Sequence, residues 1–184
     1  MKRPVVFLDR DGTVNEEVGY LNHLSRLRLL PGAAQAIRLL REAGFAVVIL
    51  TNQSGPARGY FPEALVHEVH AELRRRLAAE GAELDGLYVC LHHPEAGCPC
   101  RKPRPGLALR AAEELDLDLS RAFVVGDRWV DLALARNIGA RGVLVLTGYG
   151  RGELEYVLPQ KGLEPDLVAE DLLSAARLIL SRRA

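Results

Sequence analysis

The chain has 184 residues, of which 24 are basic and 24 acidic, so its formal net charge at pH 7 is zero. A neutral chain has no electrostatic preference for nucleic acid or for an anionic membrane, and we expect it to bind neither. The length fits one domain, predicted to span residues 1–184, with a substantial buried core. The sequence has no apolar run of the roughly 18 residues typical of a membrane helix, and its start lacks a signal-like stretch, so we expect a cytoplasmic protein.

The predicted elements alternate between short apolar strands and amphipathic helices. Strands are expected at 4–9, 45–51, 86–91, 122–126 and 142–147. Helices are expected at 33–43, 62–80, 106–115, about 129–138 and about 170–182. The stretch 148–165 is expected to be a loop, because Gly148, Gly150 and Gly152 lack the spacing and the strand-to-helix context of a dinucleotide fingerprint. The alternation predicts an α/β, Rossmann-like fold of three layers, in which helices cover both faces of a parallel sheet.

The first predicted strand ends in two carboxylates, Asp9 and Asp11, which are followed by Gly12 and Thr13. Ligands of open α/β sheets usually bind where the strands end. In extended backbone, residues at positions i and i+2 face the same way. Two like charges this close resist ionising together unless a cation or a shared proton intervenes. The pair therefore indicates a divalent metal with one carboxylate free to attack, although an ordinary polar turn has a similar composition.

Three further polar segments lie at or beside the predicted strand ends. Residues 47–50 lead into the run from Thr51 to Gly55, Arg101-Lys102-Pro103 precedes the helix at 106, and residues 123–125 lead into the run from Gly126 to Asp131. Strands of one parallel sheet bring such segments to one edge. Together these segments predict a site, and their chemistry fits phosphoryl transfer.

Each polar group has a role in such a transfer. A nucleophilic carboxylate forms an aspartyl-phosphate and splits hydrolysis into two easier steps. Mg²⁺ prefers oxygen ligands, which Asp9, Asp127 and the main-chain carbonyl of Asp11 would supply. The Thr51 hydroxyl and the Lys102 ammonium would stabilise the charge of the transferring group. The side chain of Asp11 is placed to protonate the leaving oxygen and then to deprotonate the attacking water.

All three cysteines lie in one short loop, residues 90–100, and their odd number argues against a disulfide framework. Three thiolates and one imidazole make a closed tetrahedral zinc site, so the metal would be structural. The predicted zinc ligands are Cys90, His92, Cys98 and Cys100. His93 is the alternative nitrogen ligand. Bound zinc would fix the conformation of the loop that positions Arg101 and Lys102 in the site.

The segments taken together resemble the haloacid dehalogenase superfamily of phosphotransferases. Its Asp-x-Asp-Gly-Thr, Ser/Thr, Lys and Gly-Asp-x3-Asp elements occur here in order between residues 9 and 131. The resemblance implies Asp9 as nucleophile, Asp11 as acid and base, and Asp127 as Mg²⁺ ligand. Asp131, four residues after Asp127, would orient Lys102 or a metal-bound water.

The cysteine loop followed by Arg-Lys-Pro is similar to two families within that superfamily. One comprises the D-glycero-D-manno-heptose-1,7-bisphosphate 7-phosphatases, and the other the histidinol-phosphatase domains of histidine biosynthesis. The histidinol type typically has an acid where Ser54 stands and lacks Gly106, so the heptose type is favoured and removal of a C7 phosphate is implied. The alternatives are a histidinol-phosphate phosphatase, a DNA 3′-phosphatase and a catalytically silent, zinc-stabilised binding module.

The resemblance also implies which residues touch the substrate, a small phosphorylated sugar. These are Glu17, Val18, Gly19, Tyr20, Thr51, Asn52, Gln53, Ser54, Arg101, Lys102 and Arg128. Arg101, with Arg58 helping, would hold the far phosphate. Only about 20 residues separate Asp11 from Pro31, fewer than the roughly 50 of a packed cap domain. We therefore expect no cap domain, an open site and a monomer.

Overall fold

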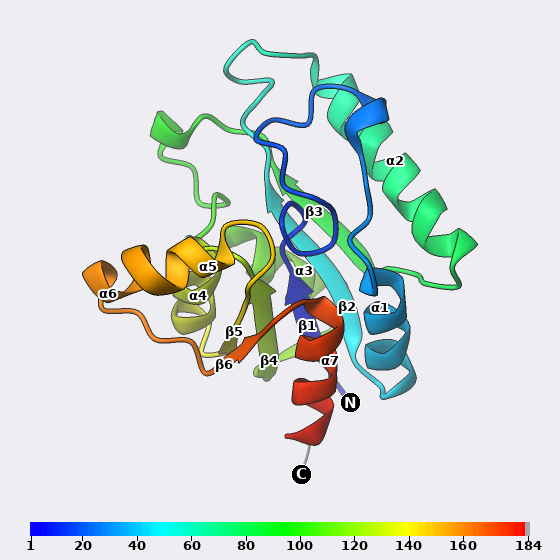
Figure 1. Ribbon diagram of the computed structural model, residues 1–184, viewed down its shortest axis with the longest axis vertical. Helices are drawn as coiled ribbons and strands as arrows, with labels where there is room; N and C mark the ends of the chain where they lie inside the picture. Colours follow the sequence, from blue (N-terminus) through cyan, green and yellow to red (C-terminus); the bar gives the residue numbers. More distant parts are fainter. Residues whose placement is uncertain (183–184) are drawn as a thin grey trace.

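The computed structural model describes residues 1–182, so the last two residues of the predicted domain, 183–184, lie outside the described part. Within this range a six-stranded sheet has the order β3-β2-β1-β4-β5-β6, and every neighbouring pair is parallel (Figure 1). The strands are β1 (Arg3–Leu8), β2 (Ala46–Asn52), β3 (Gly86–Cys90), β4 (Leu117–Gly126), β5 (Arg141–Val145) and β6 (Leu167–Ala169). The predicted parallel sheet is confirmed.

Helices cover both faces of this sheet, as predicted (Figure 1). The main helices are α1 (Ala33–Glu42), α2 (Glu63–Ala79), α3 (Gly106–Glu114), α4 (Trp129–Asn137) and α7 (Leu172–Ser181). Side chains of α1, α2 and α7 share one buried cluster, whereas those of α3, together with Leu134 and Ala135 of α4, belong to another. Adjacent strand residues divide between these clusters, because successive side chains of a strand point to opposite faces. In β1, for example, Val6 and Leu8 pack on one face and Val5 and Phe7 on the other.

The remaining elements are short and lie in the connections. They are the 3₁₀ turns η1 (Leu24–Arg26) and η2 (Pro94–Ala96), the helical turn α5 (Gly150–Gly152), the π-helical turn η3 (Glu153–Val157) and α6 (Leu158–Lys161). Between β1 and α1 the described chain holds only η1, which leaves the carboxyl edge of β1 uncovered by a further domain. None of the helices in residues 1–182 is both long and apolar enough to cross a membrane.

The prediction of a loop over residues 148–165 is wrong, because the chain is helical from 150 to 161. Tertiary packing explains the difference. Leu158 and Leu163 are buried against Leu132 and Leu144, so this segment covers the outer part of the sheet. β6 was absent from the predicted strands, since three residues carry too little pattern to be identified. β4 also begins at Leu117 rather than at 122, because its first residues pair with the start of β1.

The carboxyl ends of three central strands meet at one edge. Asp9 directly follows β1 and donates its backbone N–H to the carbonyl of Val125 in β4, at 2.9 Å. Asn52 ends β2, and Gly126 ends β4 just before Asp127. The fold therefore brings the predicted site segments to the edge where open parallel sheets bind ligands.

Candidate active site

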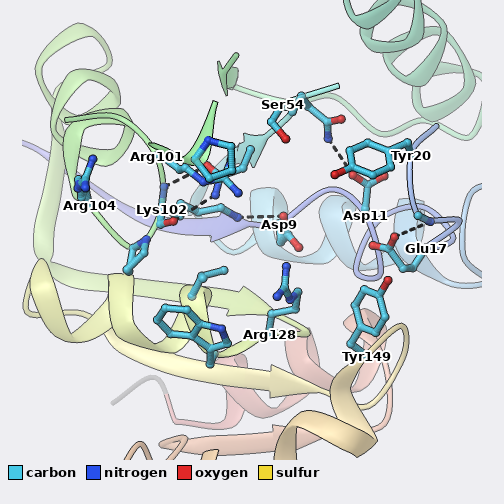
Figure 2. A pocket seen from close by; sticks show the side chains of 17 residues that line it. Asp9, Asp11, Glu17, Tyr20, Ser54, Arg101, Lys102, Arg104, Arg128 and Tyr149 are labelled. Atoms are coloured by element: carbon cyan, nitrogen blue, oxygen red, sulfur yellow. Dashed lines mark hydrogen bonds and ion pairs between the residues drawn. The ribbon is translucent and has the colours of Figure 1, made fainter. Parts of the chain in front are cut away.

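A buried lysine lies at the centre of this edge between two carboxylates. The Nζ of Lys102 donates to Asp9 Oδ1 at 2.9 Å and to Asp131 Oδ1 at 2.8 Å. Burial would by itself lower the pKa of Lys102, but the charges of Asp131 and Asp9 outweigh this effect and raise it. The lysine is therefore a fixed cation beside the Asp9 carboxylate, and Figure 2 shows it reaching toward Asp9.

The backbone around Lys102 is held by β2. The side chain of Asn52 donates to the Lys102 carbonyl at 3.2 Å and accepts the Lys102 backbone N–H at 3.0 Å. Asp131, in the first turn of α4, also accepts the backbone N–H of Arg128 through its second oxygen at 3.3 Å. Asp131 thus fixes both the lysine and the start of α4.

Asp127 is fully buried, and its two carboxylate oxygens differ in their surroundings. Oδ2 accepts the backbone N–H of Tyr149 at 2.9 Å, whereas Oδ1 has no hydrogen-bond partner. Burial raises the pKa of Asp127 to about 9, and the nearby charges of Asp9 and Asp131 add to this effect. A buried carboxylate with an unpartnered oxygen beside a second carboxylate is stable as an anion only if a cation joins it.

The residues present fit a divalent metal. Carboxylate oxygens of Asp9, Asp127 and Asp131 lie within 4.8 Å of one another. Both oxygens of Asp131 are already engaged, by Lys102 and by the Arg128 N–H, whereas Lys102 binds only one oxygen of Asp9 and Asp127 Oδ1 is unpartnered. Asp9 and Asp127 are therefore the carboxylates left to hold a cation. A hard cation with all-oxygen ligands and retained waters, such as Mg²⁺, suits this donor set.

Two glycines make room for Asp127. A Cβ on Gly148 would lie 2.2 Å from Asp127 Oδ2, and one on Gly12 would lie 2.1 Å from the same atom. Both glycines also have a positive φ, of 56° and 83°, which L side chains rarely adopt. The Thr147 hydroxyl donates to the Gly12 carbonyl at 2.6 Å, so the loop after β5 is fastened to the loop after β1.

Asp11 faces the same cavity from the loop after β1. Its Oδ1 accepts from Arg10 Nη2 at 2.8 Å, from Arg10 Nε at 3.2 Å and from Asn15 Nδ2 at 3.0 Å. Its Oδ2 accepts from Gln53 Nε2 at 2.8 Å. Burial favours protonation, but the charge and hydrogen bonds of Arg10 prevail and lower the pKa of Asp11. A phosphate dianion beside this carboxyl would shift it back toward the protonated form.

The site opens into a cavity of about 460 Å³. Nine of the eleven predicted substrate contacts line it: Glu17, Gly19, Tyr20, Asn52, Gln53, Ser54, Arg101, Lys102 and Arg128. Thr51 lies beneath the surface, where its hydroxyl accepts from Gln53 Nε2 at 2.9 Å. Val18 packs against the hydrophobic core instead of lining the cavity.

Arginine side chains in the lining of this cavity give it a positive charge. Arg101 Nη1 is buried and has no hydrogen-bond partner. Burial, together with the positive charges of Arg58 and Arg128, lowers the pKa of Arg101. In Figure 2, Arg101 and Arg128 lie on opposite sides of the Lys102–Asp9 pair. A guanidinium with an unpartnered Nη1, close to two other positive charges, is suited to receive an anion.

The four predicted zinc ligands lie together beside the cavity. Their Sγ and Nδ1 atoms fall within 4.8 Å of one another, with the three sulfur–sulfur distances between 2.7 and 3.7 Å. Tetrahedral bonds of about 2.3 Å would place sulfurs about 3.8 Å apart, which is close to the 3.6 Å and 3.7 Å that separate Cys98 from Cys90 and Cys100. With this ligand set, the cluster is compatible with zinc. The ring nitrogen that joins the sulfurs belongs to His92. His93 instead accepts the backbone N–H of Glu95 at the start of η2.

The cysteine cluster is hydrogen-bonded to the backbone of Arg101. The thiol of Cys98 is buried, which opposes ionisation, yet the backbone N–H of Arg101 and the neighbouring thiols lower its pKa to about 6. Arg104 also donates its guanidinium to the Cys98 carbonyl. The cysteine loop and the segment that carries Arg101 and Lys102 therefore form one hydrogen-bonded unit.

Four residues that support the site were not among the predicted ones. Tyr149 lines the cavity and binds Asp127 through its backbone, and Glu153 accepts from Arg128 Nε at 3.2 Å. His70 contacts Arg10, and Gly148 makes room for Asp127. Only Gly148 carried a sequence signal, because it follows a predicted strand; the others depend on contacts between distant segments.

Comparisons with known proteins identify the relatives of this chain. Residues 8–136 match the haloacid dehalogenase-like hydrolases, and residues 99–175 match the family described as HAD-hyrolase-like. The chain is 47% identical over 195 residues to the D-glycero-D-manno-heptose-1,7-bisphosphate 7-phosphatase of Thermosynechococcus vestitus, with 100% of this chain and 99% of the relative covered. It is 40% identical over 177 residues to the D-glycero-beta-D-manno-heptose-1,7-bisphosphate 7-phosphatase of Pseudomonas putida, covering 96% of this chain and 99% of that protein.

A solved structure has the same fold throughout. It is the D,D-heptose 1,7-bisphosphate phosphatase from B. bronchiseptica, crystallised with magnesium and phosphate. It superposes with a TM-score of 0.88 at 40% sequence identity, covering 98% of this chain and 99% of that one. The carboxylates at the strand ends, the central lysine and these full-length similarities lead to one conclusion: the chain belongs to the haloacid dehalogenase-like hydrolase family.

Proposed function

We propose that this chain is a Mg²⁺-dependent phosphatase that removes the C7 phosphate from D-glycero-D-manno-heptose 1,7-bisphosphate and leaves heptose 1-phosphate. The observation that carries the proposal is Arg101, whose buried, unpartnered Nη1 lies in the wall of the same cavity as Asp9. A bisphosphate has a second phosphate for this guanidinium to bind. The names of the relatives that match over the full chain support the same substrate.

Binding at both ends would make the reaction regioselective. Arg101, with Arg58 and Arg128 nearby, would hold the anomeric phosphate. The C7 phosphate would then lie against Asp9 and Lys102. Holding the far end of a substrate in this way turns binding energy into orientation of the reacting end.

Asp9 and Asp11 would carry out the reaction in two steps. In the first, an oxygen of Asp9 attacks phosphorus, the bond from phosphorus to the C7 oxygen breaks, and protonated Asp11 gives its proton to that leaving oxygen. In the second, Asp11 takes a proton from water as the water oxygen attacks the aspartyl-phosphate, which releases inorganic phosphate and restores Asp9. Lys102 stabilises the negative charge of the phosphoryl group in both steps.

Magnesium would be held by the side chains of Asp9 and Asp127 and by the main-chain carbonyl of Asp11. When bound, it supplies positive charge for the phosphoryl oxygens and offsets the repulsion between the carboxylates. The unpartnered Asp127 Oδ1 supports this assignment. Thr51 would act indirectly, since its hydroxyl holds Gln53, which in turn contacts Asp11.

Zinc would bind Cys90, His92, Cys98 and Cys100 and have a structural role. Four protein ligands leave no open position for chemistry. Its effect on the site would pass through the N–H of Arg101, which donates to Cys98. Reduced thiolates of this kind suit the cytoplasm, where disulfides are rare.

The chain would act as a monomer and as a single catalytic domain. All of the groups described above come from one chain, and they surround the edge of one sheet. The substrate would be a small phosphorylated sugar, with no requirement for nucleic acid or membrane.

The test is phosphate release with Mg²⁺ from four substrates: both anomers of heptose 1,7-bisphosphate, histidinol phosphate and a 3′-phosphorylated oligonucleotide. We expect a strong preference for one or both heptose anomers. A preference for histidinol phosphate would contradict the role of Arg101 as an anchor, and a preference for the oligonucleotide would contradict the substrate class. No release from any substrate by protein loaded with both metals would favour a binding module.

A further inference from the structure

A buried arginine links the acid and base carboxyl to a helix on the outside of the sheet. Arg10 is 1% exposed, although it lies between two site residues, Asp9 and Asp11. Its Nε and Nη2 both donate to Asp11 Oδ1, at 3.2 and 2.8 Å. Its remaining terminal nitrogen, Nη1, lies 3.0 Å from Nε2 of His70 in α2. The guanidinium therefore bridges Asp11 and His70.

The chemistry of the two groups fixes the direction of the bond between Arg10 and His70. A guanidinium has five N–H donors and no acceptor, so Nη1 must donate and His70 Nε2 must accept. His70 is consequently neutral and carries its hydrogen on Nδ1. It is 7% exposed, and burial together with the adjacent Arg10 charge lowers its pKa to about 3, in agreement with this state.

The consequence for Asp11 is that its two oxygens are unequal. Oδ1 accepts three N–H donors, two from Arg10 and one from Asn15. Oδ2 accepts one, from the Gln53 side chain that also contacts Thr51. The orientation of the Asp11 carboxyl depends on the Arg10 guanidinium. Among the side chains of residues 1–182, only His70 binds the end of this guanidinium that faces away from Asp11.

We propose that His70 is a positioning residue for proton transfer: by accepting from Arg10 it fixes the guanidinium that holds Asp11 Oδ1 and keeps Asp11 Oδ2 directed toward the leaving oxygen. The proposal rests on the proposed phosphatase function and on Asp11 as its acid and base. It assigns a role in the reaction to α2, whose other buried side chains belong to the core.

The test compares leaving groups. An alkyl phosphate needs a proton on its departing oxygen, whereas p-nitrophenolate leaves without one. The value of kcat/KM reports steps up to release of the alcohol, so it isolates the first proton transfer from the later attack by water. The measured quantity is the ratio of kcat/KM for heptose 1,7-bisphosphate to that for p-nitrophenyl phosphate, in the metal-loaded protein.

Three variants separate positioning from folding. His70→Leu removes the acceptor, and we expect the ratio to fall at least about 10-fold, a part of the 10²- to 10⁴-fold that general acid catalysis contributes. His70→Gln offers an amide oxygen to Arg10 and should keep the ratio within about threefold of wild type. Val69→Ala, a buried neighbour on α2, should lower stability and leave the ratio unchanged.

The outcomes distinguish this inference from the function on which it rests. If His70→Leu lowered kcat/KM equally for both substrates, or if Val69→Ala changed the ratio as much, the positioning role would be overturned. Failure of His70→Leu to fold would leave the glutamine variant as the test, and a tenfold loss of the ratio there would contradict the proposal. If the wild type hydrolysed a different alkyl phosphate, the proposed substrate would be wrong, and the ratio would be measured with that compound.

Discussion

Gly148 offers a test of how Asp127, the carboxylate proposed to bind Mg²⁺, is held in place. A Cβ at this position would lie 2.2 Å from Asp127 Oδ2 and 2.7 Å from the Cα of Gly12. Ordinary contacts to a Cβ begin near 3.4 Å, so in Gly148→Ala the Asp127 carboxylate must move by about 1 Å, a displacement that can reduce turnover about 100-fold. The same movement would also lengthen the hydrogen bond from the Tyr149 N–H.

Gly162 provides the matched control. It too has a positive φ, 61° against 56° for Gly148, but a Cβ there would meet nothing within 4 Å. Both alanine variants bear the left-handed backbone strain of about 1–2 kcal/mol. Only Gly148→Ala adds the collisions with Asp127 and with the Cα of Gly12, so a difference in activity between the two variants measures the effect of crowding at this point of the site.

The assay is kcat/KM together with the Mg²⁺ concentration that gives half-maximal rate, and thermal unfolding of both variants. We expect Gly148→Ala to lose about 100-fold in kcat/KM and to need more Mg²⁺, with Gly162→Ala close to wild type in both measures. Activity of Gly148→Ala within threefold of wild type would refute the reasoning. An equal loss in Gly162→Ala would show that backbone strain alone was responsible.

Three other predictions concern the nucleophile, the zinc and a buried histidine. Asp9→Asn should abolish phosphate release while the circular dichroism spectrum is kept, and retention of even a tenth of the activity would show that Asp9 is not the nucleophile. The protein should contain about one zinc per chain, and removal of the zinc by a chelator should raise KM because Arg101 becomes less well ordered. Zinc-free protein with normal kinetics would contradict a role of zinc in positioning Arg101. The pKa of His70 falls from 6.5 to about 3 on burial, so below pH 6.5 the unfolded chain binds a proton that the folded chain does not, and stability is lost as pH falls. Urea titrations at pH 7.5 and pH 5 would measure the unfolding free energy of the wild type and of His70→Gln. Between these two pH values the wild type should lose about 2 kcal/mol more than the variant. An equal loss in both proteins would contradict a neutral, buried His70.

The fold was predictable because its strands and helices carry strong local patterns. The apolar runs of β1, β2 and β4 are short and lead into polar residues, which identifies both the parallel sheet and its ligand-binding edge. The strand ends of a parallel sheet meet at one edge whatever the exact register. For this reason Asp9, Asp11 and Asp127 could be selected from the sequence before any contact between them was known.

The supporting residues could not be selected in this way. His70 reaches Arg10 across 60 positions of sequence, and Glu153 reaches Arg128 across 25. Contacts of this range depend on how helices pack on the sheet, which short-range periodicity does not determine. The helical segment from 150 to 161 was missed for a related reason, since its glycines and Pro159 conceal a helix that is stabilised by burial of Leu158.

The substrate contacts predicted at the end of β2 and just after it also show the limit of inference from single residues. Asn52 lines the cavity, but both ends of its side chain bind the backbone of Lys102. Gln53 bridges Asp11 and Thr51. These side chains hold Lys102 and Asp11 in place, a role that the sequence alone does not distinguish from direct substrate contact.

The central claim is that this chain removes one specific phosphate from a sugar bisphosphate. The most direct measurement follows heptose 1,7-bisphosphate by phosphorus NMR in the presence of Mg²⁺ and the enzyme. We predict that the C7 phosphate signal is replaced by that of inorganic phosphate while the anomeric phosphate signal persists. Loss of the anomeric signal first, or equal loss of both, would contradict the anchoring of that phosphate by Arg101 and the orientation of C7 toward Asp9.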